Sequence, residues 1–236
     1  MNRKMLALIG AFTILGATSK AVEPLSFGAK VGFVNSSIIG LDKAKKSVGN
    51  KDSEGNMFNP GFIGSAYVEY AFLDNVGAGL EVGYSGGFVS VASVKAKDDK
   101  EGKDTYKINL HRINIFPAVK FYPMGREDEN GILKLHVGAD LSIPVMAKKK
   151  QGDKDAEEIK RDEFAPFGIG AIAGVGYEFP CGLELDLRGS YAFTDVFKEN
   201  SDFKKNTLGI SDSKDKTNLY YGNFSVGYNF AVLLEE

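Results

Sequence analysis

Histidine and cysteine, which serve acid–base, nucleophilic and metal chemistry, are scarce in this sequence of 236 residues. It holds two histidines, His111 and His136, and one cysteine, Cys181, which excludes an intramolecular disulfide, a redox-active cysteine pair and a cysteine-based zinc site. Asp140 and Ser142 share one face of an alternating segment with His136, so the triad of a hydrolase or acyltransferase stays open as a minor alternative. The main interpretation is a histidine satisfied by polar neighbours inside the fold.

The other charged residues predict neither a metal site nor a nucleic-acid site. The acidic pairs Asp98 with Asp99 and Asp153 with Asp155 lack the spacing of a twelve-residue calcium loop. Lysine and arginine number 29 against 31 acidic residues, so the chain lacks the basic excess of a nucleic-acid-binding protein. We therefore expect no catalytic residue, no metal, no cofactor and no nucleic-acid partner.

An alternation of apolar and polar residues dominates the rest of the chain. A period of two is typical of β-strands, because successive side chains point to opposite faces. Eight stretches show it, at about 25–34, 61–72, 76–84, 108–122, 133–143, 168–179, 183–193 and 220–230. No charged residue falls on the apolar face of any of them, although 25% of the residues are charged. Each stretch therefore has one uniformly apolar face.

The connections between these stretches alternate between long and short. The long ones lie at about 35–60, 93–107, 147–163 and 197–217, and the short ones at 73–75, 123–131 and 180–182. Outer-membrane barrels have this asymmetry, with short periplasmic turns and long extracellular loops. The sequence thus predicts an all-β, eight-stranded, antiparallel up-and-down transmembrane β-barrel with both mature termini in the periplasm. A soluble secreted barrel is the alternative.

The first residues have the features of a secretory signal peptide. Residues 1–4 form a short basic segment, residues 5–17 form an apolar run, and the segment 19–21 supplies small residues at the cleavage positions. The apolar run is shorter than the roughly 20 residues that a membrane-spanning helix needs. We therefore predict a cleaved signal peptide at 1–21 and an outer-membrane barrel domain at 22–236.

The apolar face of each strand is expected to meet lipid, and the polar face to line the barrel lumen. Val68, Leu80, Val137 and Leu185 are assigned to the lipid face. Glycines recur on the other face, because the interior of an eight-stranded barrel has little room. Aromatic residues towards the strand ends predict interfacial girdles, formed by Tyr70, Phe72, Phe121, Tyr177, Phe179, Phe193, Tyr220, Tyr228 and Phe230.

Charged residues on the polar faces predict a structural network of ion pairs inside the lumen. We assign this network to Lys30, Glu69, Glu81, Asp140, Asp186 and Arg188, with Lys120, Lys134, Glu178 and Glu184 on the same faces. Unpaired charges in so narrow an interior would be too costly to desolvate. We expect Arg188 to bridge to Glu81 or Glu69.

The strand sequences also carry a family resemblance. The relevant pieces are FGAKVGF at 27–33, GLEVGYS at 79–85, INIFPAVKFYP at 113–123, LELDLRGSY at 183–191 followed by Thr194 and Asp195, and VGYNF at 226–230. In this order they resemble the small outer-membrane β-barrel families, and most of all the PorT-like outer-membrane barrel proteins of Bacteroidota. The resemblance covers the whole mature chain and implies the same fold, in a family with secretion-linked and adhesin-like members. The tail after Phe230 departs from the family, whose last strand commonly stops at an aromatic residue.

Two classes of function fit these features. The first is a non-enzymatic structural or interaction barrel that acts through its extracellular loops and has a lumen plugged by side chains. The second is transport, as a small diffusion channel or as a component of a secretion apparatus in the outer membrane. For either we expect a monomer that contacts outer-membrane lipid, the barrel assembly machinery during insertion, and an extracellular ligand or a secretion-complex partner.

Overall fold

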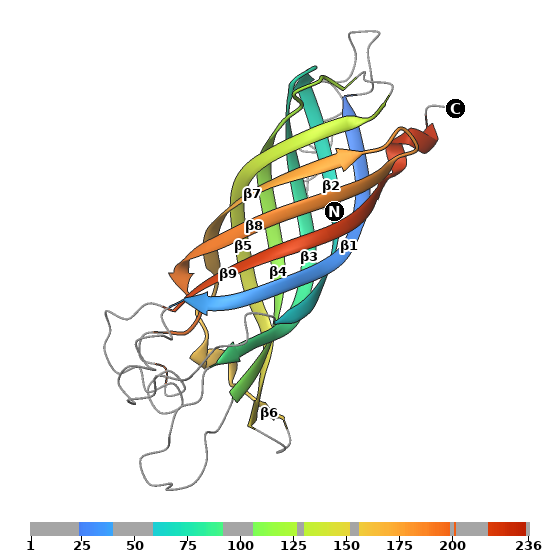
Figure 1. The fold of residues 1–236 in the computed structure, drawn as a ribbon. Helices are drawn as coiled ribbons and strands as arrows, with labels where there is room; N and C mark the ends of the chain where they lie inside the picture. Colours follow the sequence, from blue (N-terminus) through green and yellow to red (C-terminus); the bar gives the residue numbers. More distant parts are fainter. Residues whose placement is uncertain are drawn as a thin grey trace, which may run out of the picture.

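Eight long strands form a closed antiparallel barrel in the computed structural model (Figure 1). The structure describes residues 24–39, 59–91, 106–126, 130–151, 156–198, 201 and 217–234. The predicted signal peptide at 1–21 lies outside the described residues, as do most of the predicted loops at 35–60, 93–107 and 197–217.

The strands follow one another around the barrel in chain order. They are β1 (Leu25–Ile39), β2 (Pro60–Leu73), β3 (Val76–Val91), β4 (Tyr106–Phe121), β5 (Ile132–Gln151), β7 (Gly168–Glu178), β8 (Leu183–Asp195) and β9 (Asn218–Asn229). Every neighbouring pair is antiparallel, and the ladder between β9 and β1 closes the sheet. The predicted eight-stranded up-and-down barrel is confirmed.

The two ends of the barrel differ in their connections. At one end, which we call the turn end, β2 joins β3, β4 joins β5 and β7 joins β8 through short segments. The barrel also begins and finishes at this end, where β9 runs into the 3-10 helix η3 (Phe230–Leu234). The opposite end, called the loop end, carries the long connections and is predicted to be extracellular. Among the described residues, no helix is long and apolar enough to cross a membrane.

Two predicted loop boundaries are wrong, because the first residues of the expected loops at 35–60 and 147–163 are strand. β1 continues to Ile39 and pairs with β9 as far as Asn218. β5 continues to Gln151 and pairs with β4 as far as Tyr106. The short strand β6 (Glu157–Glu158) then folds back on Lys148 and Lys149, and is followed by the 3-10 helix η1 (Arg161–Glu163). The register of the β4–β5 ladder shifts between His111 and Arg112. Beyond this point β5 carries the charged residues Lys148, Lys149 and Lys150, so the apolar–polar alternation stops before the strand ends.

The outer surface of the barrel is an apolar belt with aromatic residues near both ends. Val68, Leu80 and Val137 are exposed on it, and Leu185 is partly buried there, as predicted. Three strands carry the same Tyr-x-Phe motif where they reach the turn end. In each motif the two ring centroids lie 5.0–5.6 Å apart. The pairs are Tyr70 with Phe72, Tyr177 with Phe179 and Tyr228 with Phe230. Tyr191 and Phe193 form a matching pair, 5.8 Å apart, near the loop end of β8.

Candidate functional site: the barrel lumen

The inward faces of the strands fill the half of the lumen nearest the turn end with charged side chains. Lys30 on β1 reaches Glu184 and Asp186 on β8, with its Nζ 2.7 Å and 3.3 Å from their carboxylate oxygens. All three side chains are almost completely buried. Their position follows from the period of two, because the flanking residues of each point to lipid.

A second group of ion pairs lies between β2, β4 and β5. Glu69 accepts hydrogen bonds from Lys120 and Lys134. The Nζ atom of Lys134 also lies 2.6 Å from Glu178 and 3.6 Å from Glu184. Lys134 and Glu184 therefore connect this group to Lys30.

Arg188 on β8 completes the network towards the middle of the barrel. Its Nη2 donates to Glu81 on β3 over 2.7 Å, and its Nε donates to Asp186. The bridge thus runs to Glu81 rather than to Glu69. The network joins four basic and five acidic side chains, so most of its charge is neutralised inside the barrel.

Tyr67 occupies the centre of this polar half. The Nζ atoms of Lys30, Lys120 and Lys134 lie 4.9 Å, 5.5 Å and 5.9 Å from the centroid of its ring. Cations placed over an aromatic face are attracted to its electron density. A Cβ atom at Gly28 would lie 2.6 Å from the Tyr67 hydroxyl, which explains why a glycine is needed on the inward face at this level.

Asp140, which the sequence assigned to the charge network, lies apart from these ion pairs. Its Oδ2 accepts hydrogen bonds from Ser190 over 2.5 Å and from Tyr221 over 2.9 Å. Both donors are neutral. Asp140 therefore belongs to a polar layer above the ion pairs, where the guanidinium of Arg112 also lies 4.9 Å from the Tyr221 ring.

The alternative triad of His136, Asp140 and Ser142 is not assembled. Both ring nitrogens of His136 are buried without a hydrogen-bond partner among the described residues, and its nearest carboxylate is Asp186, 3.9 Å away. Asp140 is engaged by Ser190 and Tyr221 instead. The expectation that polar neighbours satisfy His136 is also wrong, because its cross-strand neighbour on β7 is Gly174, which has no side chain to bond it.

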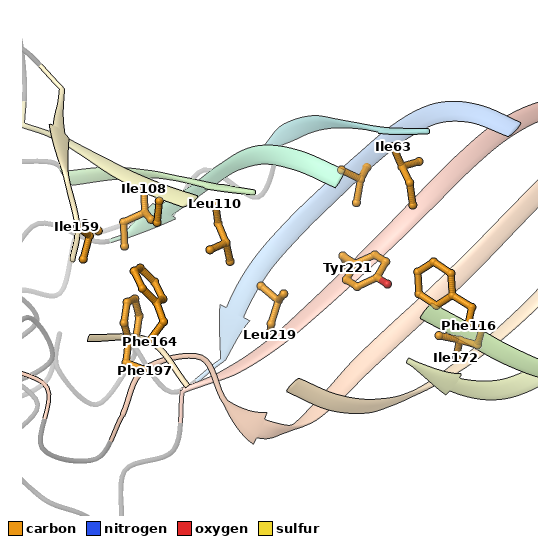
Figure 2. Close-up of a cluster of buried hydrophobic side chains, with 12 residues drawn as sticks. Ile63, Ile108, Leu110, Phe116, Ile159, Phe164, Ile172, Phe197, Leu219 and Tyr221 are labelled. Carbon is orange, nitrogen blue, oxygen red and sulfur yellow. The ribbon is translucent and has the colours of Figure 1, made fainter. Parts of the chain in front are cut away.

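Beside the polar layer around Asp140, the half of the lumen nearest the loop end holds a cluster of apolar side chains, which the sequence analysis missed. Buried side chains form one continuous cluster, made of Val34, Ile63, Ile108, Leu110, Phe116, Ala147, Ile159, Phe164, Ile172, Phe197, Leu219 and Tyr221. Figure 2 shows them following one another from Phe116 and Ile172 inside the barrel to Phe164 and Phe197 near the loop end. We call this cluster the apolar column.

Segments outside the barrel strands close the apolar column at its outer limit. The rings of Phe164 and Phe197 lie 5.3 Å apart, and the two residues form an isolated β-bridge. Backbone hydrogen bonds from Ala165 to Val196 and from Lys198 to Glu163 hold the two segments together. A signal for the column was present in pairs such as Phe33-Val34 and Phe62-Ile63, where both faces of a strand are apolar.

Little space is left between these side chains. A cavity lined by Tyr67, Glu81, Phe116, His136 and Arg188, among others, leaves about 10 Å³ for the centre of a water molecule. A second cavity, beside Arg112 and Leu110, is equally small. Each is near the lower limit for holding one water.

The turn end of the lumen is covered by polar contacts. The Nη2 of Arg126 donates to the hydroxyl of Ser26 over 2.7 Å, and the side-chain amide of Asn229 donates to Glu178 over 2.8 Å. Tyr122 is fully buried beneath them, and this burial, with a smaller contribution from Glu69, raises the pKa of its phenol. No cluster of three or more potential metal ligands occurs among the described residues, and the acidic pairs at Asp98 and Asp153 lie outside them.

A closed eight-stranded barrel with an apolar outer belt and a charged interior defines a small outer-membrane β-barrel protein. A family model described as "Outer membrane protein beta-barrel domain" matches residues 17–198, which is more than half of the chain. The protein therefore belongs to this family, and its location is the outer membrane.

Comparison with solved structures returned several small barrels. The attachment invasion locus protein Ail of Yersinia pestis is 13% identical, with 87% of this chain and 98% of that chain covered and a TM-score of 0.40. Neisserial surface protein A is 16% identical, with coverages of 87% and 96% and a TM-score of 0.44. The outer membrane protein OprG of Pseudomonas aeruginosa is 13% identical, with coverages of 87% and 94% and a TM-score of 0.42. A search of curated proteins gave no match.

Proposed function

We propose that this protein is a non-enzymatic barrel with a side-chain-plugged lumen, which works as a structural or interaction protein through its extracellular loops. The observation that carries this proposal is the filling of the lumen over its whole length. The ion pairs occupy the half nearest the turn end, and the apolar column fills the other half together with the polar layer around Asp140 and Arg112.

The two halves oppose the passage of solutes in different ways. Buried ion pairs resist opening, because removing one partner leaves an uncompensated charge in a low-dielectric interior. The aliphatic and phenylalanine side chains of the apolar column offer permeating ions or water no hydrogen-bonding partners, so passing them requires desolvation. A filled interior of this kind suits a scaffold that presents its loops.

The test is conductance of the purified, folded protein in planar lipid bilayers. The proposal expects no steady current for the unmodified barrel. A stable ion-conducting pore would contradict it and favour the small diffusion channel. The bilayers should also receive a known porin as a positive control for insertion and detection.

The interaction role needs a partner, and the described part of the loop end offers charged side chains for one. Lys148 on β5 and Lys160 beside η1 are both exposed there. Crosslinking on intact cells followed by purification is expected to recover a surface ligand with the unmodified protein and less of it with Lys148→Glu and Lys160→Glu combined. If the unmodified protein and the double variant recover periplasmic secretion components in equal amounts, the secretion-apparatus alternative is favoured. The PorT-like resemblance suggested that alternative.

A further inference from the structure

A groove of about 500 Å³ lies on the outer, lipid-facing surface across β9, β1, β2 and β3. Its walls are outward side chains, namely Val31, Phe33, Phe62, Tyr84, Phe224 and Val226. The backbone of β1 and β2 forms its floor. The groove is separate from the lumen, because its walls belong to the apolar belt.

Gly64 keeps this groove open. It lies on the outward face of β2, opposite Val31 on β1 and Tyr84 on β3. A Cβ atom built on Gly64 would meet nothing within 4 Å, and its φ angle is not in the positive range. Neither crowding nor backbone geometry therefore requires a glycine at this position, and any larger side chain would project into the groove.

A polar pair lies beside the groove on its loop-end side. The Tyr84 hydroxyl lies 2.9 Å from Nδ1 of His111, and the His111 and Phe62 rings meet edge to face at 6.4 Å. When the Tyr84 hydroxyl donates to Nδ1, Nε2 of His111 carries the proton and becomes a donor. His111 is only partly buried, so this donor is available to an acceptor outside the barrel.

We propose that the groove binds one acyl chain of an outer-leaflet membrane lipid, and that Nε2 of His111 donates a hydrogen bond to an ester or phosphate oxygen of the same lipid. The belt faces hydrocarbon in the outer membrane, so an acyl chain is the occupant that its surroundings supply. Apolar walls below a single hydrogen-bond donor match a lipid, which has an apolar chain below a polar headgroup. With the loop end outside the cell, the polar pair lies on the side of the outer-leaflet headgroups.

The test compares lipid retention by native mass spectrometry after mild detergent extraction from outer membranes. We expect the unmodified protein to keep one lipid per chain, and Gly64→Leu to lower the retained fraction about tenfold, which corresponds to roughly two buried methylene contacts. Gly189→Leu is the matched control, because Gly189 is also exposed on the outer face with nothing within 4 Å of a Cβ. It should retain lipid like the unmodified protein.

Two further variants separate the chain site from the headgroup contact. Gly64→Ala fills less of the groove and should give an intermediate loss, while His111→Gln, which keeps a donor, should retain more lipid than His111→Ala. Equal retention by Gly64→Leu and Gly189→Leu would overturn the proposal. The proposal would also be overturned if the protein formed a lipid-free complex of two chains that Gly64→Leu dissociates and Gly189→Leu does not. The groove would then be an interface between two copies.

Discussion

The same residue types contribute very differently to stability according to where the barrel places them. Lys30 and Lys134 are buried and surrounded by carboxylates in the lumen. Lys149, by contrast, pairs with Glu157 at 3.0 Å on the partly exposed extension of β5. An exposed pair gains little, because water and salt screen it, whereas a buried charge that loses its partner stays desolvated.

Arg188→Ala should therefore lower the free energy of unfolding by about 3–5 kcal/mol, because Glu81 is left without its cation and Asp186 keeps only Lys30. Lys149→Ala, which removes the exposed pair, should change it by less than about 1 kcal/mol. Urea unfolding of both variants in lipid vesicles measures the difference. Equal midpoints for the two variants would mean that the lumenal pairs do not hold the barrel together.

On the outer face, a charge is costly only where the strand lies in hydrocarbon. Leu80→Arg and Leu185→Arg should each lower barrel stability by about 2–4 kcal/mol, because both leucines point to the membrane interior. Met124→Arg is the control, since Met124 is also an exposed apolar residue outside the lumen but lies in the β4–β5 connection. The same urea titration measures all three. Unchanged midpoints for the two leucine variants would argue against the outer belt as the lipid face.

At the scale of the strands, the period of two predicted most of what the structure contains. The face that each residue occupies could be predicted from the sequence, because side chains alternate between the two faces of a strand. A membrane barrel differs from a soluble one only in that its apolar face points outward. Strand lengths could not, because β5 continues beyond the apolar belt with Lys148 and Lys150, where no membrane enforces the pattern. The apolar column was missed for a related reason. Inward residues such as Leu110 and Leu219 share one cluster with Phe164 and Phe197 from connecting segments, and the strand pattern does not show which connecting residues join it.

The orientation of the strands gives a prediction at the same scale. Protease added to intact cells should cut within the predicted extracellular loops at 93–107 or 147–163, in the parts that lie between strands, 93–105 and 152–156. It should spare the connection at 122–131 unless the outer membrane is permeabilised. Immunoblotting of the fragments reads out the sites. First cleavage at 122–131 in intact cells would reverse the topology.

At the scale of the whole molecule, the lumen consists of two unlike regions in series. Phe116 lies where they meet, with the Arg188 guanidinium 5.6 Å from its ring and the apolar column on its other side. Ions moving through the barrel would have to cross both regions. A path through two barriers in series conducts only when both are open, so the proposed plugged lumen predicts that each region closes it independently of the other.

This arrangement predicts how the barrel responds when the regions are opened one at a time. Arg188→Ala, or Leu110→Ala together with Leu219→Ala, should lower stability without producing a steady current in planar bilayers, because the unaltered region still fills its half of the lumen. Large-to-small changes at such buried leucines cost about 2–5 kcal/mol each, so folding of every variant must be verified by heat-modifiable gel mobility before recording. The triple variant, in which both regions are weakened, should be the first to conduct. A steady current through Arg188→Ala or through the double leucine variant would show that the altered region alone closes the lumen. The other region would then contribute to packing but not to closure.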